Sequence, residues 1–347
     1  MDKTSKAKAR NSNIELVRII SMFLIALSHY TVHNGVNNAE LPLGVNRFLL
    51  EFSALGNIGV ILFVLITGYF LGRSTKPLQP KRLIKTIAEV FFYSVAIYGV
   101  LCLLGILDFD APTFIKCLFP ITFMQYWFAT AYVVLYLFHP FINRLLNNLS
   151  RKEELRLIMT GLVVFSILHT LSSMNFYGNE LVQFILFYII GDYLGRYKDN
   201  LFAKKEWRSA VFIGSLLAII VSIIGLDLLG RQSALAVQYL SLLLSLTSPL
   251  EIALAAAIFS FFIYRKETYS RAINFVAAST FAVYLISDNK FIRPILWRDL
   301  FASSAFLESG LLIGHMLLSV FVVFVACVLI DMARRALFRP TVDRLLD

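Results

Sequence analysis

The chain has 347 residues, of which 58% are apolar, 14% aromatic and 16% charged, and its formal net charge is +10. Soluble domains carry about 25% charged residues, so this composition excludes an ordinary soluble protein and indicates an integral membrane protein. The positive charges lie in short segments between apolar runs, a distribution that reports membrane topology and argues against a nucleic-acid partner.

About ten apolar runs are long enough to cross a bilayer, which takes roughly 20 residues as a helix. The sequence therefore predicts an all-α, multi-pass membrane protein. The predicted spans are 13–33, 52–72, 84–106, 124–143, 155–172, 180–196, 208–226, 246–264, 274–290 and 307–332. The ninth could continue as a re-entrant or interfacial piece through FIRPILW, where Pro294 interrupts the helix.

The Lys and Arg residues predict the orientation of these spans. With the N-terminus inside, 25 of the 32 fall in cytoplasmic segments, six in outer segments, and Arg18 lies within the first span. Both termini are therefore predicted to be cytoplasmic. We interpret residues 1–347 as a single transmembrane domain with a basic N-terminal tail (1–12) and a cytoplasmic C-terminal tail (333–347).

The first span carries four ionisable residues, Glu15, Arg18, His29 and His33. Ser12 and Glu15 have the S-x-x-E spacing of a capping box, which predicts the start of a helix. Eleven helical residues turn through almost three full circles, so Arg18 and His29 share a face and lie about 16 Å apart along the axis. Such groups are costly in hydrocarbon and by default mark a functional interior or a water-filled cavity.

His29 is the strongest candidate for chemistry in this span. A neutral imidazole can take a proton from a hydroxyl or carry an acyl group transiently. An inert, hydrogen-bonded histidine at the end of a span fits the spacing equally well. Arg18 could hold a phosphate or a developing negative charge, or could anchor the helix at the inner headgroups. Glu15 can pair with Arg18 along the helix.

Other polar and aromatic residues give weaker signals. His33 follows His29 by one turn, but without a third ligand or an H-E-x-x-H pattern we expect no metal. Trp127, between Tyr126 and Phe128, is typical of an interfacial aromatic belt and could also stack against a sugar ring. The pairs Gly68-x-x-x-Gly72 and Gly191-x-x-x-Gly195 predict close packing of their helices.

Five stretches, taken in order, resemble the membrane acyltransferase 3 family, the ten-helix enzymes that O-acylate cell-envelope carbohydrates. Its first-helix pattern is an acidic residue, a basic residue three positions later and a histidine after ten more, which Glu15, Arg18 and His29 match. The other four are GVILFVLITGYFLGR (59–73), KRLIK (81–85), WFATAYVVLYLFHPFIN (127–143) and STFAVYLISDN (279–289). The chain departs from the family in having Thr67 in place of a serine and Ser287 where members often have histidine.

This resemblance implies an acyl-CoA donor, most commonly acetyl-CoA, and a hydroxyl of an extracytoplasmic polysaccharide or related glycan as acceptor. It implies a catalytic role for His29 with Arg18 and Glu15. Coenzyme A would be held from the cytoplasmic side, and the acceptor would lie at the outer side. The expected contacts to coenzyme A are Arg73, Lys81, Arg82 and Tyr69, and those to the acceptor are Trp127 and His33.

Two other functions remain open on the sequence. One is a transporter or flippase for a lipid-linked sugar, in which His29 and Arg18 line a pathway without making bonds. The other is a non-catalytic scaffold in a polysaccharide assembly complex. All three place the chain in the cell membrane, in contact with the lipid bilayer.

Overall fold

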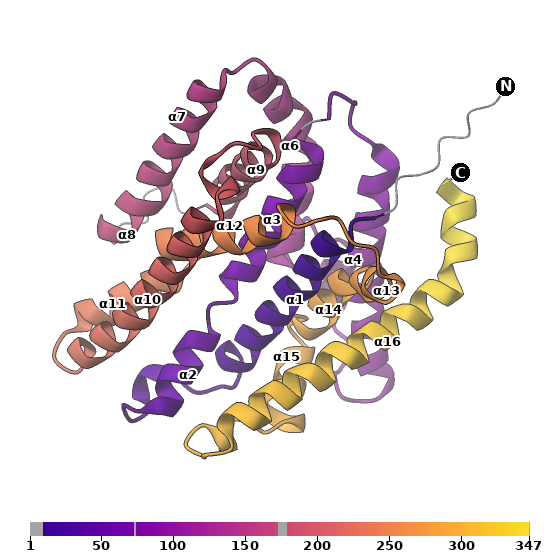
Figure 1. Ribbon diagram of the computed structural model, residues 1–347. Coiled ribbons are helices and arrows are strands. Elements are labelled where there is room, and N and C mark those ends of the chain that lie inside the picture. The colour runs from indigo at the N-terminus through magenta and orange to yellow at the C-terminus, as the bar shows by residue number, and fades with distance from the viewer. Residues whose placement is uncertain (1–9, 73, 173–178, 347) are drawn as a thin grey trace.

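The computed structural model describes residues 10–72, 74–172 and 179–346, and in this part of the chain the regular structure is helical, without strands (Figure 1). Helices occupy all ten of the predicted ranges. The helices are α1 Ser12–Val32, α2 Val45–Ser53, α3 Asn57–Leu71, α4 Pro80–Leu103, α5 Ala111–Leu118, α6 Trp127–Asn147, α7 Arg151–Leu162, α8 Leu168–Ser172, α9 Glu180–Arg196, α10 Lys205–Gly230, α11 Ala234–Leu243, α12 Pro249–Ile263, α13 Arg271–Ala277, α14 Thr280–Ser287, α15 Ile292–Pro294 and α16 Leu312–Leu346.

Six helical stretches in the described residues are long and apolar enough to cross a membrane. They are Ser12–Val32, Val45–Leu71, Pro80–Leu103, Arg151–Ser172, Lys205–Gly230 and Leu312–Phe338. The helices at the other predicted ranges are shorter or more polar. The count of about ten spans and the cytoplasmic placement of both termini therefore stay predictions.

Several predicted spans are broken or extended in the structure. The range 274–290 divides into α13 and α14, and 246–264 contains only α12, which begins at Pro249. At the C-terminus, α16 starts at Leu312 and runs to Leu346. The segment after residue 332, predicted to be a tail, is therefore a continuation of the last helix. Polar residues do not by themselves end a helix.

The start of α1 differs from the predicted capping box. Asn11 is the N-cap, and its side chain accepts a hydrogen bond from the backbone of Asn13. Ser12 is already helical, and its hydroxyl donates to Asn274 Oδ1 at 2.8 Å and accepts from the backbone of Ser270 at 2.7 Å. Tertiary contacts to α13 thus occupy the hydroxyl that the local pattern assigned to capping.

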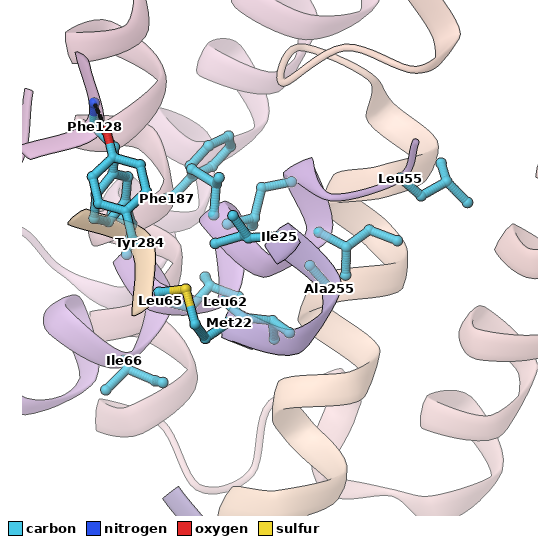
Figure 2. Close-up of a cluster of buried hydrophobic side chains, with 14 of the residues drawn as sticks. Met22, Ile25, Leu55, Leu62, Leu65, Ile66, Phe128, Phe187, Ala255 and Tyr284 are labelled. Atoms are coloured by element: carbon cyan, nitrogen blue, oxygen red, sulfur yellow. Dashed lines mark hydrogen bonds between the residues drawn. The ribbon is translucent and has the colours of Figure 1, made fainter. Parts of the chain in front are cut away.

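Helix α1 lies among α3, α12, α13, α14 and α16, so it runs through the interior of the protein (Figure 1). Figure 2 shows the apolar core around it, where Met22 and Ile25 of α1 lie with Leu62 and Leu65 of α3 and Ala255 of α12. Burial of these side chains fixes which face of α1 turns toward α3, and that orientation sets the direction of His29.

Helices α3 and α9 pack so closely that their backbones are in contact, as the two glycine pairs predicted. A Cβ atom on Gly68 would lie 2.0 Å from the carbonyl oxygen of Tyr188, and one on Gly191 would lie 2.3 Å from that of Leu65. Hydrogen is therefore the only side chain that fits at these two positions without moving a helix.

We expect Gly68→Ala to separate α3 from α9 and to lower the thermal midpoint of the protein in detergent by about 5 °C or more, since overpacking costs about 1–3 kcal/mol. Gly99→Ala on α4 is the matched control, because nothing lies within 4 Å of its Cβ position. Equal midpoints for the two variants, measured by scanning fluorimetry, would contradict this packing.

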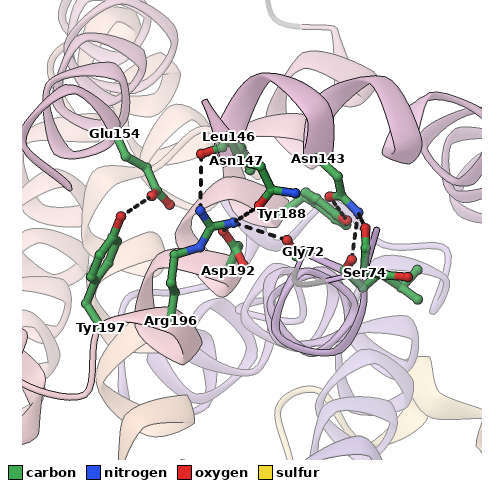
Figure 3. A network of polar contacts seen from close by, with 11 residues as sticks. Gly72, Ser74, Asn143, Leu146, Asn147, Glu154, Tyr188, Asp192, Arg196 and Tyr197 are labelled. Carbon is green, nitrogen blue, oxygen red and sulfur yellow. Dashed lines mark hydrogen bonds and ion pairs between the residues drawn. The ribbon is translucent and has the colours of Figure 1, made fainter. Parts of the chain in front are cut away.

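The C-terminal end of α3 is also held by a polar network (Figure 3). Arg196 of α9 donates to the carbonyl oxygens of Gly72 at 3.2 Å and Leu146 at 3.1 Å, and it pairs with Asp192 at 2.8 Å. Asn143 of α6 donates to the carbonyl of Leu71 at 2.7 Å. These bonds satisfy the C-terminal carbonyl groups of α3 and tie α3, α6 and α9 together at the predicted cytoplasmic side.

Candidate active site

A cavity of about 400 Å³ lies beside the C-terminal half of α1. Met22, Ile25 and His29 line it at spacings of three and four residues, so one face of α1 forms a continuous wall. The first turn of α3 forms a second wall through Asn57. In the orientation that the sequence predicts, the cavity would lie in the extracytoplasmic half of the protein.

Two histidines, one carboxylate and one guanidinium meet at this cavity. Oδ1 of Asp288 lies 3.4 Å from Nε2 of His29 and 3.5 Å from Nε2 of His33. The same oxygen accepts a hydrogen bond from Nε of Arg293 at 2.9 Å and lies 2.6 Å from its Nη2. All four residues line the cavity. The single negative charge of the carboxylate therefore faces two imidazoles, which can be protonated, and one guanidinium, which is permanently positive.

The corner between α14 and α15 places the carboxylate and the guanidinium. Asp288 caps the C-terminus of α14, its backbone N–H bonding to the carbonyl of Tyr284 at 2.9 Å, and its side chain is 2% exposed. Asn289 donates to the hydroxyl of Tyr126 at 2.7 Å and so attaches the corner to the start of α6. Arg293 lies five residues further on, in α15, and its side chain is 31% exposed where it lines the cavity.

Aromatic rings form the side of the cavity opposite α1. Trp127 and Phe128 at the start of α6 line it with Tyr284 of α14. The Tyr284 hydroxyl accepts a hydrogen bond from the backbone of Phe128 at 3.3 Å (Figure 2). Tyr126 is buried and accepts a hydrogen bond from Asn289. The prediction that it belongs to an interfacial aromatic belt is therefore wrong. Trp127 lies where a sugar ring in the cavity could stack.

Arg18 and Glu15 occupy the same helix as His29 but lie outside the cavity lining. Arg18 donates to Glu15 at 2.9 Å, and its guanidinium lies over the ring of Phe70 at 5.8 Å. It stands one turn before Met22 on the face that forms the cavity wall. The shared face predicted for Arg18 and His29 therefore exists, but buried Met22 and Ile25 lie between the two groups.

The residues expected to hold coenzyme A are dispersed. Tyr69 lies under the ammonium group of Lys198 at 5.4 Å and packs against Phe259. Lys81 and Arg82 are exposed in the first turn of α4, away from the His29 cavity. Arg73 lies outside the described residues. The structure thus brings together His29, His33 and Trp127 and does not gather the basic residues around them.

Asp288 and Arg293 are the two charged groups of the site that sequence reasoning did not select. In the late family-like motif, Ser287 is the visible departure from the family pattern, and the carboxylate of Asp288 belongs to the next residue. Ser287 is buried, and its hydroxyl has no hydrogen-bond partner among the described residues. The sequence does contain a signal for both residues. Asp288 is an isolated carboxylate at the end of an apolar run, and an arginine follows five residues later, a pattern that indicates a functional polar site.

The same cluster has the donors of a small metal site. One ligand atom from each of His29, His33 and Asp288 lies within 4.8 Å of the other two. Two imidazoles and a carboxylate can bind a divalent ion such as zinc. Arg293 already supplies a positive charge to the same carboxylate oxygen, and a metal would have to displace it or share the oxygen with it.

A histidine–carboxylate pair lines an aromatic cavity within a bundle of apolar helices, and such a pair can act as a general base. The chain belongs to the acyltransferase 3 family: the family model, described as an acyltransferase domain, matches residues 11–332. The protein is therefore a membrane acyltransferase. The match includes every helix that contributes to the cavity. No curated protein and no solved structure matched the chain.

Proposed function

We propose that the protein transfers an acyl group, acetyl as the simplest case, from cytosolic acyl-CoA to a hydroxyl of an extracytoplasmic cell-surface glycan. The observation that supports this most directly is the position of His29, whose imidazole lies on the cavity wall 3.4 Å from the Asp288 carboxylate. Acyl transfer to a hydroxyl needs a base near neutral pH, and an imidazole beside a carboxylate is the common solution.

In this reaction the acceptor sugar enters the cavity from the outer side. Its ring stacks against Trp127, and its hydroxyl faces His29. His29 takes the hydroxyl proton as the oxygen attacks the thioester carbonyl, or it first accepts the acyl group itself. In both routes a positive charge develops on the imidazole, and Asp288 stabilises it. Arg293 holds the carboxylate in place through its hydrogen bond from Nε.

The donor is proposed to reach the cavity from the cytoplasmic end of α1. Arg18 stands there, and the Lys198–Tyr69 pair lies at the cytoplasmic end of α3. Cations of this kind bind the phosphates of coenzyme A by charge-assisted hydrogen bonds. The pantetheine arm would have to pass Met22 and Ile25 to bring the thioester to His29, so these apolar side chains must part during the cycle.

A transporter of lipid-linked sugars and a non-catalytic scaffold are the competing functions. Labelled acetyl-CoA decides between them: the purified protein in nanodiscs should release free thiol and transfer label to base-deacetylated surface polysaccharide from the cells that express it. A transporter or scaffold would do neither. The same assay in EDTA should keep its rate, because the proposed reaction uses no metal. Loss of activity that Zn²⁺ restores would assign the His29–His33–Asp288 cluster to a metal ion instead.

A further inference from the structure

The cavity contains a second imidazole that the reaction as proposed above does not use. His33 follows His29 by four residues as the C-cap of α1, and the two rings are 5.3 Å apart between centroids. The His33 side chain is 19% exposed against 13% for His29, and it lies nearer the outer end of the helix. The two nitrogens are within 0.1 Å of the same distance from Oδ1 of Asp288, at 3.4 and 3.5 Å.

We propose that the two histidines divide the reaction, with His29 as the acyl carrier and His33 as the base that activates the acceptor. This inference rests on the acyltransferase function proposed above. One carboxylate placed equally between two imidazoles can neutralise a positive charge on either of them, but not on both at once. In a reaction whose positive charge passes from the His29 ring to the His33 ring, Asp288 can stabilise the charge in both steps.

In the first step Nε2 of His29 attacks the thioester carbonyl carbon. The carbon–sulfur bond breaks, coenzyme A leaves as thiolate and takes a proton from cytosolic water, and His29 becomes a cationic acyl-imidazolium. The hydrogen on Nδ1 stays in place, because this buried atom has no partner among the described residues that could accept the proton. Asp288 neutralises the new charge.

In the second step the acceptor oxygen attacks the acyl carbon while its proton passes to Nε2 of His33. The carbon–nitrogen bond breaks, the electron pair returns to His29, and the positive charge now resides on His33 beside the same carboxylate. His33 then releases its proton to the outer solvent, from which its partly exposed ring is accessible. The sum is thioester plus alcohol giving ester plus thiol, with one proton taken up on the cytosolic side and one released on the outer side.

The test separates the two half-reactions. In nanodiscs without acceptor, isotope-labelled coenzyme A should exchange into acetyl-CoA, because acyl-His29 forms reversibly. His33→Gln should retain this exchange within about threefold and lose transfer to the deacetylated polysaccharide by about 100-fold or more, the usual contribution of a general base. His33→Ala with imidazole added to the buffer should regain part of the transfer, and its exchange should not change.

Three outcomes would overturn the division of roles. Wild-type transfer without exchange would mean direct transfer by a single base, and the acyltransferase function would still stand. Equal losses of exchange and transfer in His33→Gln would make His33 a structural partner of the first step, and equal retention would remove it from the reaction. Neither exchange nor transfer in the wild type would instead reject the proposed function itself. Glu40→Gln, at an exposed position in the same outer loop, serves as the control variant.

Discussion

His29→Gln should lower acyl transfer by about 1,000-fold or more while the protein still inserts and folds. Glutamine keeps polar atoms near the position of the ring nitrogens, so the cavity wall stays polar, but it can neither take the acceptor proton nor carry an acyl group. Removing a group that acts in bond making costs about 10²–10⁴ in rate when it acts as a base, and more when it is also the nucleophile.

The measurement is transfer of labelled acetyl to deacetylated polysaccharide at matched protein concentration, with size-exclusion elution and thermal midpoint recorded for each variant. His29 is largely buried, with 13% of its side chain exposed, so folding has to be checked directly. A folded His29→Gln or His29→Ala protein that acylates at the wild-type rate would remove His29 from the chemistry and leave the cavity to another role.

Asp288→Asn should lower the transfer rate by about 100-fold or more. The substitution preserves the shape of the side chain and removes the negative charge between the two imidazoles, and Arg293 then stands beside them unneutralised. A positive charge on either ring becomes less favourable in both half-reactions, because the compensating carboxylate is gone.

Asp288→Glu is the matched comparison, because it keeps the charge and displaces it by one methylene, so it should retain more activity than Asp288→Asn. If the asparagine variant is as active as wild type, the contact to Asp288 is structural. Arg293→Gln tests the partner: the carboxylate would lose the hydrogen bond from Nε, and we expect a smaller loss than for Asp288→Asn, since the negative charge remains.

The role of Asp288 also bears on the departure at Ser287. Family members often carry histidine at that position, and this chain has a buried serine whose hydroxyl finds no partner among the described residues. The next residue instead presents a carboxylate to His29. We infer that in this chain the corner after α14 serves the site through Asp288, so the missing histidine does not leave His29 without a partner.

Much of the architecture was predictable because it depends on local patterns. Long apolar runs predict helices wherever they occur, and the small residues of α3 and α9 predicted the close packing that Gly68 and Gly191 now show. The face of α1 that carries His29 followed from helical periodicity, and it is the wall of the cavity. Membership of the acyltransferase family followed from short motifs in order along the chain.

Contacts between distant segments were decided only by the tertiary structure. Asp288 and His29 lie about three quarters of the chain length apart in sequence, and nothing in either local pattern specifies that their helices meet. The apolar core that turns α1 toward α3 and α14 brings them together and also inserts Met22 and Ile25 between His29 and Arg18. Periodicity determines which residues share a face, but packing against other helices determines what that face meets.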